Sequence, residues 1–373
     1  MSGSMPPHPT DGAAGPRGYI PVLDGLRALA ILLVLAAHAG LERVVPGAFG
    51  VTLFFFISGY LITRQLLTAL AREGRVGMSN FYLRRVLRLA PAGVAYVALS
   101  GLAYVALGGR ISALGWLAAV FYGANLYDLW IGYRSTLAGM RHPFNILWSL
   151  AIEEHFYAVW PLALAALWRW RHAAGGLLAI CLAVLAWRIW LFGHCTWHFS
   201  AVCGRVQTNP QWRYNRLYQG TDTRIDSIAW GALLAVLEHS RPDTRIFARL
   251  WPLGAILLFA SLIPLGGEFT RQALRTTVQG AGLVLLFPHL LQARGWVGRA
   301  LCAPTALLIG RLSYSLYLWH WGAFAVADRV AGQARPLWLA MALPLAGGLA
   351  AASYFLVEQP VLRLRRRVGS HAV

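Results

Sequence analysis

The 373-residue chain contains no lysine, few acidic residues and little charge of either sign. Only 13% of the residues are charged, whereas 58% are hydrophobic. This composition excludes an intrinsically disordered protein and an ordinary soluble enzyme. Four cysteines are too few for a disulfide-stapled mini-protein, and no CxxC or His/Cys ligand spacing occurs, so we expect no metal site.

The basic residues outnumber the acidic ones by 33 to 14, and all 33 are arginine. A net charge of +19 could indicate a nucleic-acid-binding protein. These arginines, however, lie in short segments between apolar runs, where positive charge sets the orientation of a membrane protein. The sequence therefore predicts a lipid bilayer as the surroundings and no nucleic-acid partner.

Long apolar runs recur through most of the chain, which predicts an all-α, polytopic transmembrane helical bundle. We expect a flexible cytoplasmic tail over residues 1–18, one membrane domain over 19–360 and a basic cytoplasmic tail over 361–373. Residues 1–18 lack the apolar core of a signal peptide. The candidate spans are 20–40, 49–71, 89–108, 111–131, 144–168, 173–193, 225–238, 250–266, 273–293, 303–326 and 336–357.

The arginine positions reduce these eleven candidates to about ten spans. If the segment 111–131 does not cross fully, every arginine-rich loop falls on the cytoplasmic side, as does each terminus. This segment carries Asn125 and Asp128, so we expect it to be re-entrant or to lie on the outer surface.

The polar loop 194–223 then faces outward. Cys195 and Cys203 lie in it, and a disulfide between them is as plausible as two free thiols. Aromatic side chains in this loop suit stacking against a sugar: Trp197, Trp212, Tyr214 and Tyr218.

Ionisable residues inside membrane spans are costly and are usually functional. Asp24 and Arg27 are three residues apart, so they form a helix-end ion pair or part of a site. His38 follows Arg27 by eleven residues, roughly 16 Å along a helix. It is either a structural histidine or a general base. The small pair Ser58-Gly59 favours close helix packing.

The segment 145–161 carries Trp148, Glu153 and Glu154 in an apolar helix, for which function is favoured over a helix-start anchor. The side chains of Arg224 and Asp226 should find partners on other helices, and His320 is equally consistent with a structural or a functional role. The outer half of the bundle therefore holds these residues: His38, Trp148, Glu153, Glu154, Arg224, Asp226 and His320.

Arg84, Arg85 and Arg88 are grouped at the predicted cytoplasmic face. Positive-inside placement explains some of this charge, and binding of a phosphate-bearing ligand explains its clustering equally well. An acid–base group on one side and an anion site on the other suggest group transfer across the membrane from a phosphate-bearing carrier.

The chain resembles the acyltransferase-3 family of integral-membrane O-acyltransferases along residues 19–360. Glu358-Gln359-Pro360 departs from the family pattern, in which a second acid is common. The stretches that carry the resemblance are LDGLRALAILLVLAAH, GVTLFFFISGYLI, FYLRRVLRLAP, LWSLAIEEHFYAVWP, TRIDSIAWG, LIGRLSYSLYLWHW and SYFLVEQP.

This resemblance implies transfer of an acyl group, often acetyl from acetyl-CoA, to a hydroxyl of a cell-surface or exported glycan or a lipid-linked sugar. It also implies a bacterial inner-membrane location, and a protein partner is conceivable. The family's arginine–histidine motif falls on Arg27 and His38, its double-arginine motif on Arg85 and Arg88, and its tryptophan–glutamate motif on Trp148 and Glu153.

We therefore expect His38, Glu153 and Arg27 to be catalytic, with His38 as the general base and Glu153 orienting its ring. An acyl-histidine relay is an alternative mechanism. The expected donor is acyl-CoA, without a metal. It would be bound by Arg84, Arg85 and Arg88, and the acceptor by Trp148, Glu154, Arg224, Asp226 and His320.

Two other functions fit the composition. Intramembrane acids, arginines and histidines also line transporter pathways, so a proton-coupled exporter of an acylated or anionic metabolite is the main alternative. Transporters usually contain an internal repeat, and none is visible in this sequence. The other is an idle scaffold of a polysaccharide assembly complex, which the presence of His38 and Glu153 disfavours.

Overall fold

The computed structural model describes residues 19–137, 140–169, 172–195, 203, 210–240, 249–263, 267–332 and 334–363. Within these residues every regular element is a helix, which confirms the predicted all-α class. The expected tail over 1–18 lies outside the described residues, as does most of the tail over 361–373.

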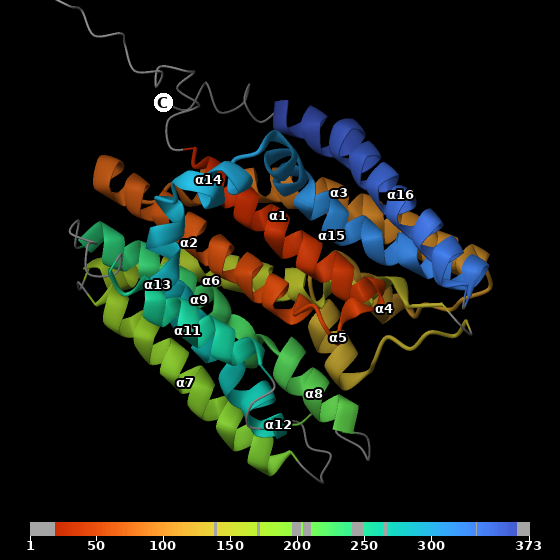
Figure 1. The fold of residues 1–373 in the computed structure, drawn as a ribbon, viewed down its shortest axis with the longest axis horizontal. Coiled ribbons are helices and arrows are strands. Elements are labelled where there is room, and N and C mark those ends of the chain that lie inside the picture. The colour runs from red at the N-terminus through yellow and green to blue at the C-terminus, as the bar shows by residue number, and fades with distance from the viewer. Residues whose placement is uncertain are drawn as a thin grey trace, which may run out of the picture.

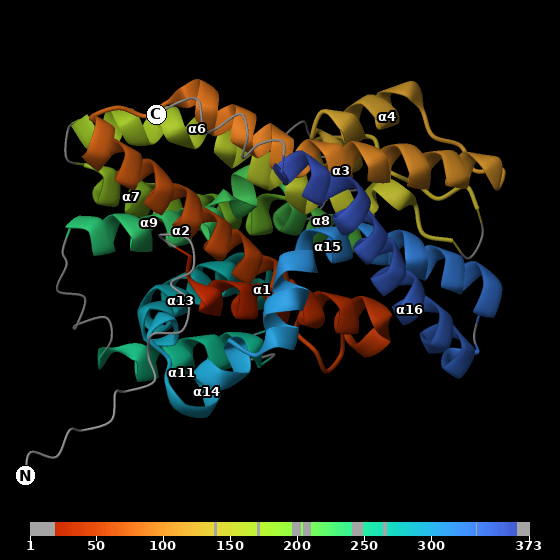
Figure 2. The same ribbon diagram turned by 90° about the horizontal axis from the view of Figure 1, so that it is seen from above.

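The long helices run side by side in one bundle, with α1 near its centre (Figure 1). Helix α1 (Pro21–Ala36) begins at a proline in its first turn and continues as the π-helical segment η1 (Ala37–Leu41). It packs between α2 (Gly47–Glu73) and α15 (Pro304–Ala331). Outside α15 lies α16 (Arg335–Ser353), which continues as η4 (Tyr354–Glu358), and α3 (Met78–Ala106) lies near it in both views (Figures 1 and 2).

A second group of helices covers the other side of α2 (Figure 2). Helix α9 (Thr221–Ser240) packs along α2 and contacts α6 (Trp148–Arg169), α7 (Ala173–His194) and α13 (Arg275–Leu291), and α13 packs on α11 (Trp251–Leu262). Short helices connect the long ones: α4 (Ala113–Val120), α5 (Ala124–Trp130), η2 (Pro143–Leu147), α8 (Pro210–Gln219), α12 (Gly267–Phe269), η3 (Thr270–Leu274) and α14 (Gly295–Leu301).

Glycine sets the close crossing of α2 and α9. A Cβ atom on Gly59 would stand 1.9 Å from the carbonyl oxygen of Ile228, and one on Gly231 would stand 1.9 Å from that of Phe56. Each backbone therefore packs directly on the other, as small residues allow in membrane helices. The packing role predicted for Gly59 is confirmed.

Six helical segments in the described residues are long and apolar enough to cross a membrane, and α14 with α15, which meet at a 47° bend, would make a seventh. The chain is thus a multi-pass membrane protein, but the structure does not confirm the expected ten spans. Helix α11 has only 12 residues and α13 only 17, and α9 carries four charged residues. The six segments are Pro21–Leu41, Gly47–Glu73, Met78–Ala106, Pro143–Leu167, Ala173–His194 and Arg335–Arg363.

The segment 111–131 does not cross, as the arginine pattern predicted. It forms α4 and α5, of 8 and 7 residues, broken at Tyr122, whose φ is 56°. Eight helical residues span only about 12 Å, well short of the roughly 30 Å of a bilayer core.

Cys195 and Cys203 form a disulfide, which decides between the two alternatives left open by the sequence. Both sulfurs are buried beside Leu191 and Leu217. Of the aromatic residues proposed for sugar stacking, Tyr218 is described, whereas Trp197 and the side chains of Trp212 and Tyr214 lie outside the described part of the chain.

Candidate active site

Two cavities lie along α1, and among the described residues two side chains line both of them. The cavity of about 100 Å³ that contains Arg85 is here called the Arg85 cavity. The cavity of about 720 Å³ that contains His38 is called the His38 cavity. Val51 and Tyr317 line both and form the partition between them. The Tyr317 hydroxyl is held by Ser149 Oγ at 2.5 Å.

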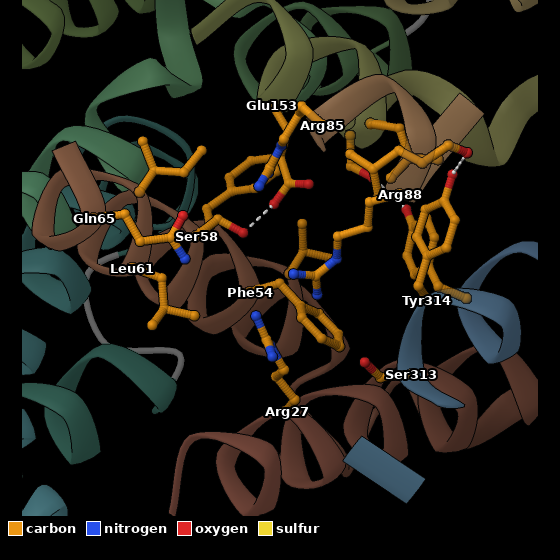
Figure 3. A pocket seen from close by; sticks show the side chains of 17 residues that line it. Arg27, Phe54, Ser58, Leu61, Gln65, Arg85, Arg88, Glu153, Ser313 and Tyr314 are labelled. Atoms are coloured by element: carbon orange, nitrogen blue, oxygen red, sulfur yellow. Dashed lines mark hydrogen bonds between the residues drawn. The ribbon is translucent and has the colours of Figure 1, made fainter. Parts of the chain in front are cut away.

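Three arginines meet in the Arg85 cavity (Figure 3). Arg27 reaches in from α1, and Arg85 and Arg88 reach in from α3. The Arg85 guanidinium lies 3.4 Å from the centre of the Tyr157 ring, and its buried Nε has no hydrogen-bond partner among the described residues. Facing them is one acid, Glu153, so positive charge exceeds negative charge here.

Arg27 forms the helix-end ion pair and is also part of the site, so both interpretations of the sequence apply to it. Its Nη1 lies 3.2 Å from Asp24 Oδ1, as expected for a pair three residues apart, and its side chain also lines the cavity. Arg84 is exposed and does not line either cavity, because its neighbours Arg85 and Arg88 occupy the inward face of α3.

Glu153 was placed beside His38 by the sequence, and this placement is wrong. Ser58 Oγ donates to Glu153 Oε1 at 2.7 Å, and both side chains line the Arg85 cavity (Figure 3). The reason is the direction of α6. Trp148, at its start, lines the His38 cavity, and Glu153 lies roughly 7.5 Å further along the helix, at the level of the arginines.

His38 instead pairs with His320, which is fully buried. Its Nδ1 lies 2.9 Å from His320 Nε2, and His320 Nδ1 lies 3.0 Å from the Leu316 carbonyl oxygen. A carbonyl only accepts, so in the neutral pair His320 carries its proton on Nδ1 and accepts on Nε2. His38 then donates from Nδ1, which leaves the lone pair on its Nε2.

The backbone at His38 is held by a residue that the sequence did not indicate. The Arg141 guanidinium donates to the His38 carbonyl oxygen at 3.3 and 3.4 Å and pairs with Asp328 at 2.8 Å. It also packs 4.9 Å from the centre of the Trp321 ring, which itself meets the His38 ring edge-on at 5.1 Å. Arg141 lies in a connecting segment with no recognised motif, so no sequence signal pointed to it.

Aromatic and polar side chains form the far wall of the His38 cavity. Trp148 packs on Tyr218 with ring centres 4.8 Å apart, and both line the cavity. Arg224 is buried beside it, where it donates to Thr52 Oγ1 at 3.2 Å and lies 5.1 Å from the Tyr218 ring centre. Arg271 and Arg275, which the sequence analysis did not single out, also line this wall.

Of the expected acceptor-binding residues, Trp148 lines the His38 cavity, and Arg224 and His320 contact residues of its wall. The other two, Asp226 and Glu154, line neither cavity. Asp226 forms a completely buried ion pair with Arg188 at 2.8 Å, which ties α9 to α7. The sequence correctly predicted that Asp226 has its partner on another helix. Neither Asp226 nor Arg188 lines either cavity, so we assign the pair a structural role. Glu154 also lines neither of them, since it follows Glu153 by one residue and points about 100° away.

In the part of the chain that the structure describes, no three His, Cys, Asp or Glu side chains are grouped so as to hold a metal ion. The His38 cavity offers an imidazole, and the Arg85 cavity offers an arginine cluster.

The sequence profile of a family described as an acyltransferase domain matches residues 20–357. A provisionally named peptidoglycan O-acetyltransferase of Bacillus subtilis, YrhL, is 30% identical over 92% of this chain and 55% of its own length. The peptidoglycan O-acetyltransferase OatA of Listeria monocytogenes is 27% identical over 92% of this chain and 56% of its own length. The chain thus spans about half the length of the curated relatives it matches. No solved structure matches it.

Proposed function

The chain belongs to the acyltransferase-3 family, and on this premise we propose that it is a membrane-bound O-acyltransferase. It moves an acyl group, by default acetyl, from acyl-CoA on the cytoplasmic side to a hydroxyl of a cell-envelope glycan. The observation that carries the proposal is the pair of cavities: an arginine cluster and a base-bearing site separated only by Val51 and Tyr317.

The donor enters on the arginine side. Arg85 and Arg88, with Arg27, bind its phosphates, because guanidinium groups form paired, charge-assisted hydrogen bonds to phosphate oxygens. Glu153 offsets part of the positive charge and keeps the Ser58 hydroxyl oriented. The thioester end then reaches the partition, where movement of Val51 and Tyr317 admits it to the base.

The acceptor hydroxyl reacts in the His38 cavity. His38 Nε2 takes the hydroxyl proton as the oxygen attacks the thioester carbonyl carbon. The new C–O bond forms, the C–S bond breaks, and the imidazolium returns its proton to the departing thiolate of CoA.

His320, rather than Glu153, is the positioning residue for the base. By accepting from His38 Nδ1 it selects the tautomer with the lone pair on Nε2, and its own tautomer follows from the Leu316 carbonyl. The buried acid of a catalytic triad performs the same task with a charge. Here a neutral ring does so in an apolar helix.

We propose that the arginine side faces the cytoplasm, in a bacterial inner membrane. Fused reporters can check this orientation at two open turns. A reporter at Gly74, between α2 and α3, should report a cytoplasmic location, and one at Gly332, after α15, an external location. The opposite pattern would reverse the assignment of donor and acceptor sides.

An acyl-transfer assay tests the function. Purified protein in lipid is incubated with radiolabelled acetyl-CoA and a cell-wall glycan, beside His38→Ala and the matched control His289→Ala. His289 stacks on Trp251 and lines neither cavity. We expect label on the glycan, a loss of about 10²- to 10⁴-fold with His38→Ala and near-normal activity with His289→Ala. Full activity of His38→Ala would reject His38 as the base. Transport of an acylated or anionic metabolite across the membrane, without any labelled product, would indicate the exporter.

A further inference from the structure

A small side pocket opens from the His38 cavity between α2, α9 and η3. The two share six lining residues, so they adjoin. The pocket, here called the Arg275 pocket, has a volume of only about 10 Å³, whereas the His38 cavity has about 720 Å³. A sugar ring therefore fits only in the larger cavity, and the pocket has room for about one oxygen atom of a group carried by the sugar.

The charge in the Arg275 pocket is of one sign. Arg224, Arg271 and Arg275 line it, and no acidic residue of the described chain does. Arg271 approaches Glu268 at 3.7 Å, but both side chains are about half exposed, so this pair is weak. Three arginines around so small a space favour an anion with oxygen atoms.

Buried polar atoms in the same wall lack partners. Gln272 Oε1 and Thr276 Oγ1 have no hydrogen-bond partner among the described residues, although the two residues are 7% and 9% exposed. Leaving such atoms buried and unpaired costs free energy, so a ligand that pairs with them is favoured. The Thr276 hydroxyl can donate to an anion oxygen, whereas Gln272 Oε1 only accepts and therefore suits a hydroxyl of the same sugar. Both side chains line the pocket.

The backbone supports the same assignment. Arg271 and Gln272 lie in η3, a π-helical segment, and His38 lies in η1, another π-helical segment that lines the same cavity. Such segments are rare and occur frequently at functional sites. Here both segments contribute side chains to one cavity.

We propose that the Arg275 pocket is an anion subsite for the acceptor, so that the preferred acceptor is a glycan bearing a carboxylate or a phosphate near the hydroxyl that is acylated. This inference rests on the proposed function and names its substrate class. The sugar ring packs beside Trp148 and Tyr218 and its hydroxyl faces His38. The anion lies at the mouth of the Arg275 pocket, between Arg271 and Arg275, and places one oxygen atom inside it.

Calorimetric binding without donor tests the subsite separately from catalysis. Four probes are titrated into the full chain in lipid: a muramic-acid disaccharide with a free carboxylate, its methylamide, a hexosamine 1-phosphate and the corresponding neutral methyl glycoside. We expect at least one anionic probe to bind about tenfold more tightly than its neutral partner, as loss of a charge-assisted hydrogen bond predicts. The probe that shows the preference identifies the anion as a carboxylate or a phosphate.

Arg275→Gln should remove this preference, and Thr276→Val, which keeps the side-chain shape, should reduce it several-fold. The matched control Arg72→Gln changes an exposed arginine at the end of α2 and should leave it intact. Equal binding of the charged and neutral probes by the wild-type chain would overturn the subsite, as would a preference that survives both Arg275→Gln and Thr276→Val.

Labelled acetyl transfer to the same probes keeps the two hypotheses apart. An anion preference in binding without any acylated product would support the subsite and reject the proposed function. Acylation of charged and neutral probes with equal KM would support the function and reject the subsite.

Discussion

The Arg85 cavity and the His38 cavity lie along the same central helix but differ in size and in chemistry. The first is small, and three arginines and one glutamate line it. The second is about seven times larger, and its lining mixes one imidazole, aromatic rings, glutamines and aliphatic side chains with two arginines and two glutamates. A small cationic cavity suits a fixed phosphate group, whereas a large mixed cavity suits a bulky, hydroxylated acceptor.

The difference indicates that the two ends of α1 have different functions in the proposed reaction. Arg27 and His38 are separated by roughly three turns of α1, which continues into the π-helical η1. One rigid element thus places the phosphate-binding end and the base at a constant separation. Transfer between the cavities then depends on the two side chains of the partition.

After loss of His38 itself, the largest expected effect comes from blocking that partition. Val51→Phe should lower the turnover of acyl transfer by about a hundredfold, because small displacements of reacting groups have effects of this size. Binding of CoA and of the acceptor, measured separately, should remain close to normal. Val51→Ala is the matched control and should retain turnover. A Val51→Phe protein that is folded and fully active would show that the cavities do not communicate there.

A second substitution changes only the hydrogen bond between His320 and the base His38. His320→Ala removes the acceptor for His38 Nδ1 and should lower kcat by about tenfold, the ratio that one hydrogen bond to a base is worth. The acceptor KM should be unchanged, because the role is positioning. His320→Gln offers a carbonyl oxygen and should recover part of kcat. Equal losses in the Ala and Gln variants would contradict a hydrogen-bonding role.

The corresponding substitution in the Arg85 cavity is Arg85→Gln. It should raise the KM for acyl-CoA by about five- to tenfold, since a charge-assisted contact to phosphate is lost. The affinity for the acceptor should not change. Arg85→Lys retains the charge without the planar guanidinium. Its KM for acyl-CoA should therefore lie between those of the wild-type chain and Arg85→Gln. If Arg85→Gln weakens acceptor binding instead, the assignment of the two cavities must be exchanged.

The smallest effect concerns stability near the His38 cavity. Burial lowers the pKa of His142 from 6.5 to about 4, and its Nδ1 accepts from the Phe144 amide. Between these pH values the unfolded chain binds a proton that the native chain excludes, so stability falls as pH drops from 6.5 toward 4. The loss should be on the order of 1–3 kcal/mol.

Thermal melts of the wild-type chain and of His142→Asn between pH 7 and pH 4.5 measure this effect. His142 is linked to His38 through Trp321. Its carbonyl oxygen accepts from Trp321 Nε1, and the Trp321 ring meets the His38 ring edge-on. We expect the melting temperature of the wild-type chain to fall more steeply with acid than that of the variant. Parallel curves would show that His142 does not titrate in this range.

Several features were predictable from the sequence because they depend on local pattern. Apolar runs and scattered arginines predicted a helical membrane protein, and the grouping of Arg85 and Arg88 predicted a shared site. Asn125 and Asp128 marked a segment that does not cross. Charge within α9 and the shortness of α11 and α13 explain why the ten expected spans are not confirmed.

The long-range pairs were not predictable. The sequence alone determined the class of protein, the arginine-rich end of the bundle and His38 as a candidate base, since each follows from composition or helical spacing. Only the tertiary structure decided that His38 pairs with His320, 282 residues away, and that Glu153 pairs with Ser58 beside the arginines. The physical reason is that hydrogen-bond partners inside a bundle come from different helices, whose relative rotation and depth depend on packing at crossings such as Gly59 and Gly231.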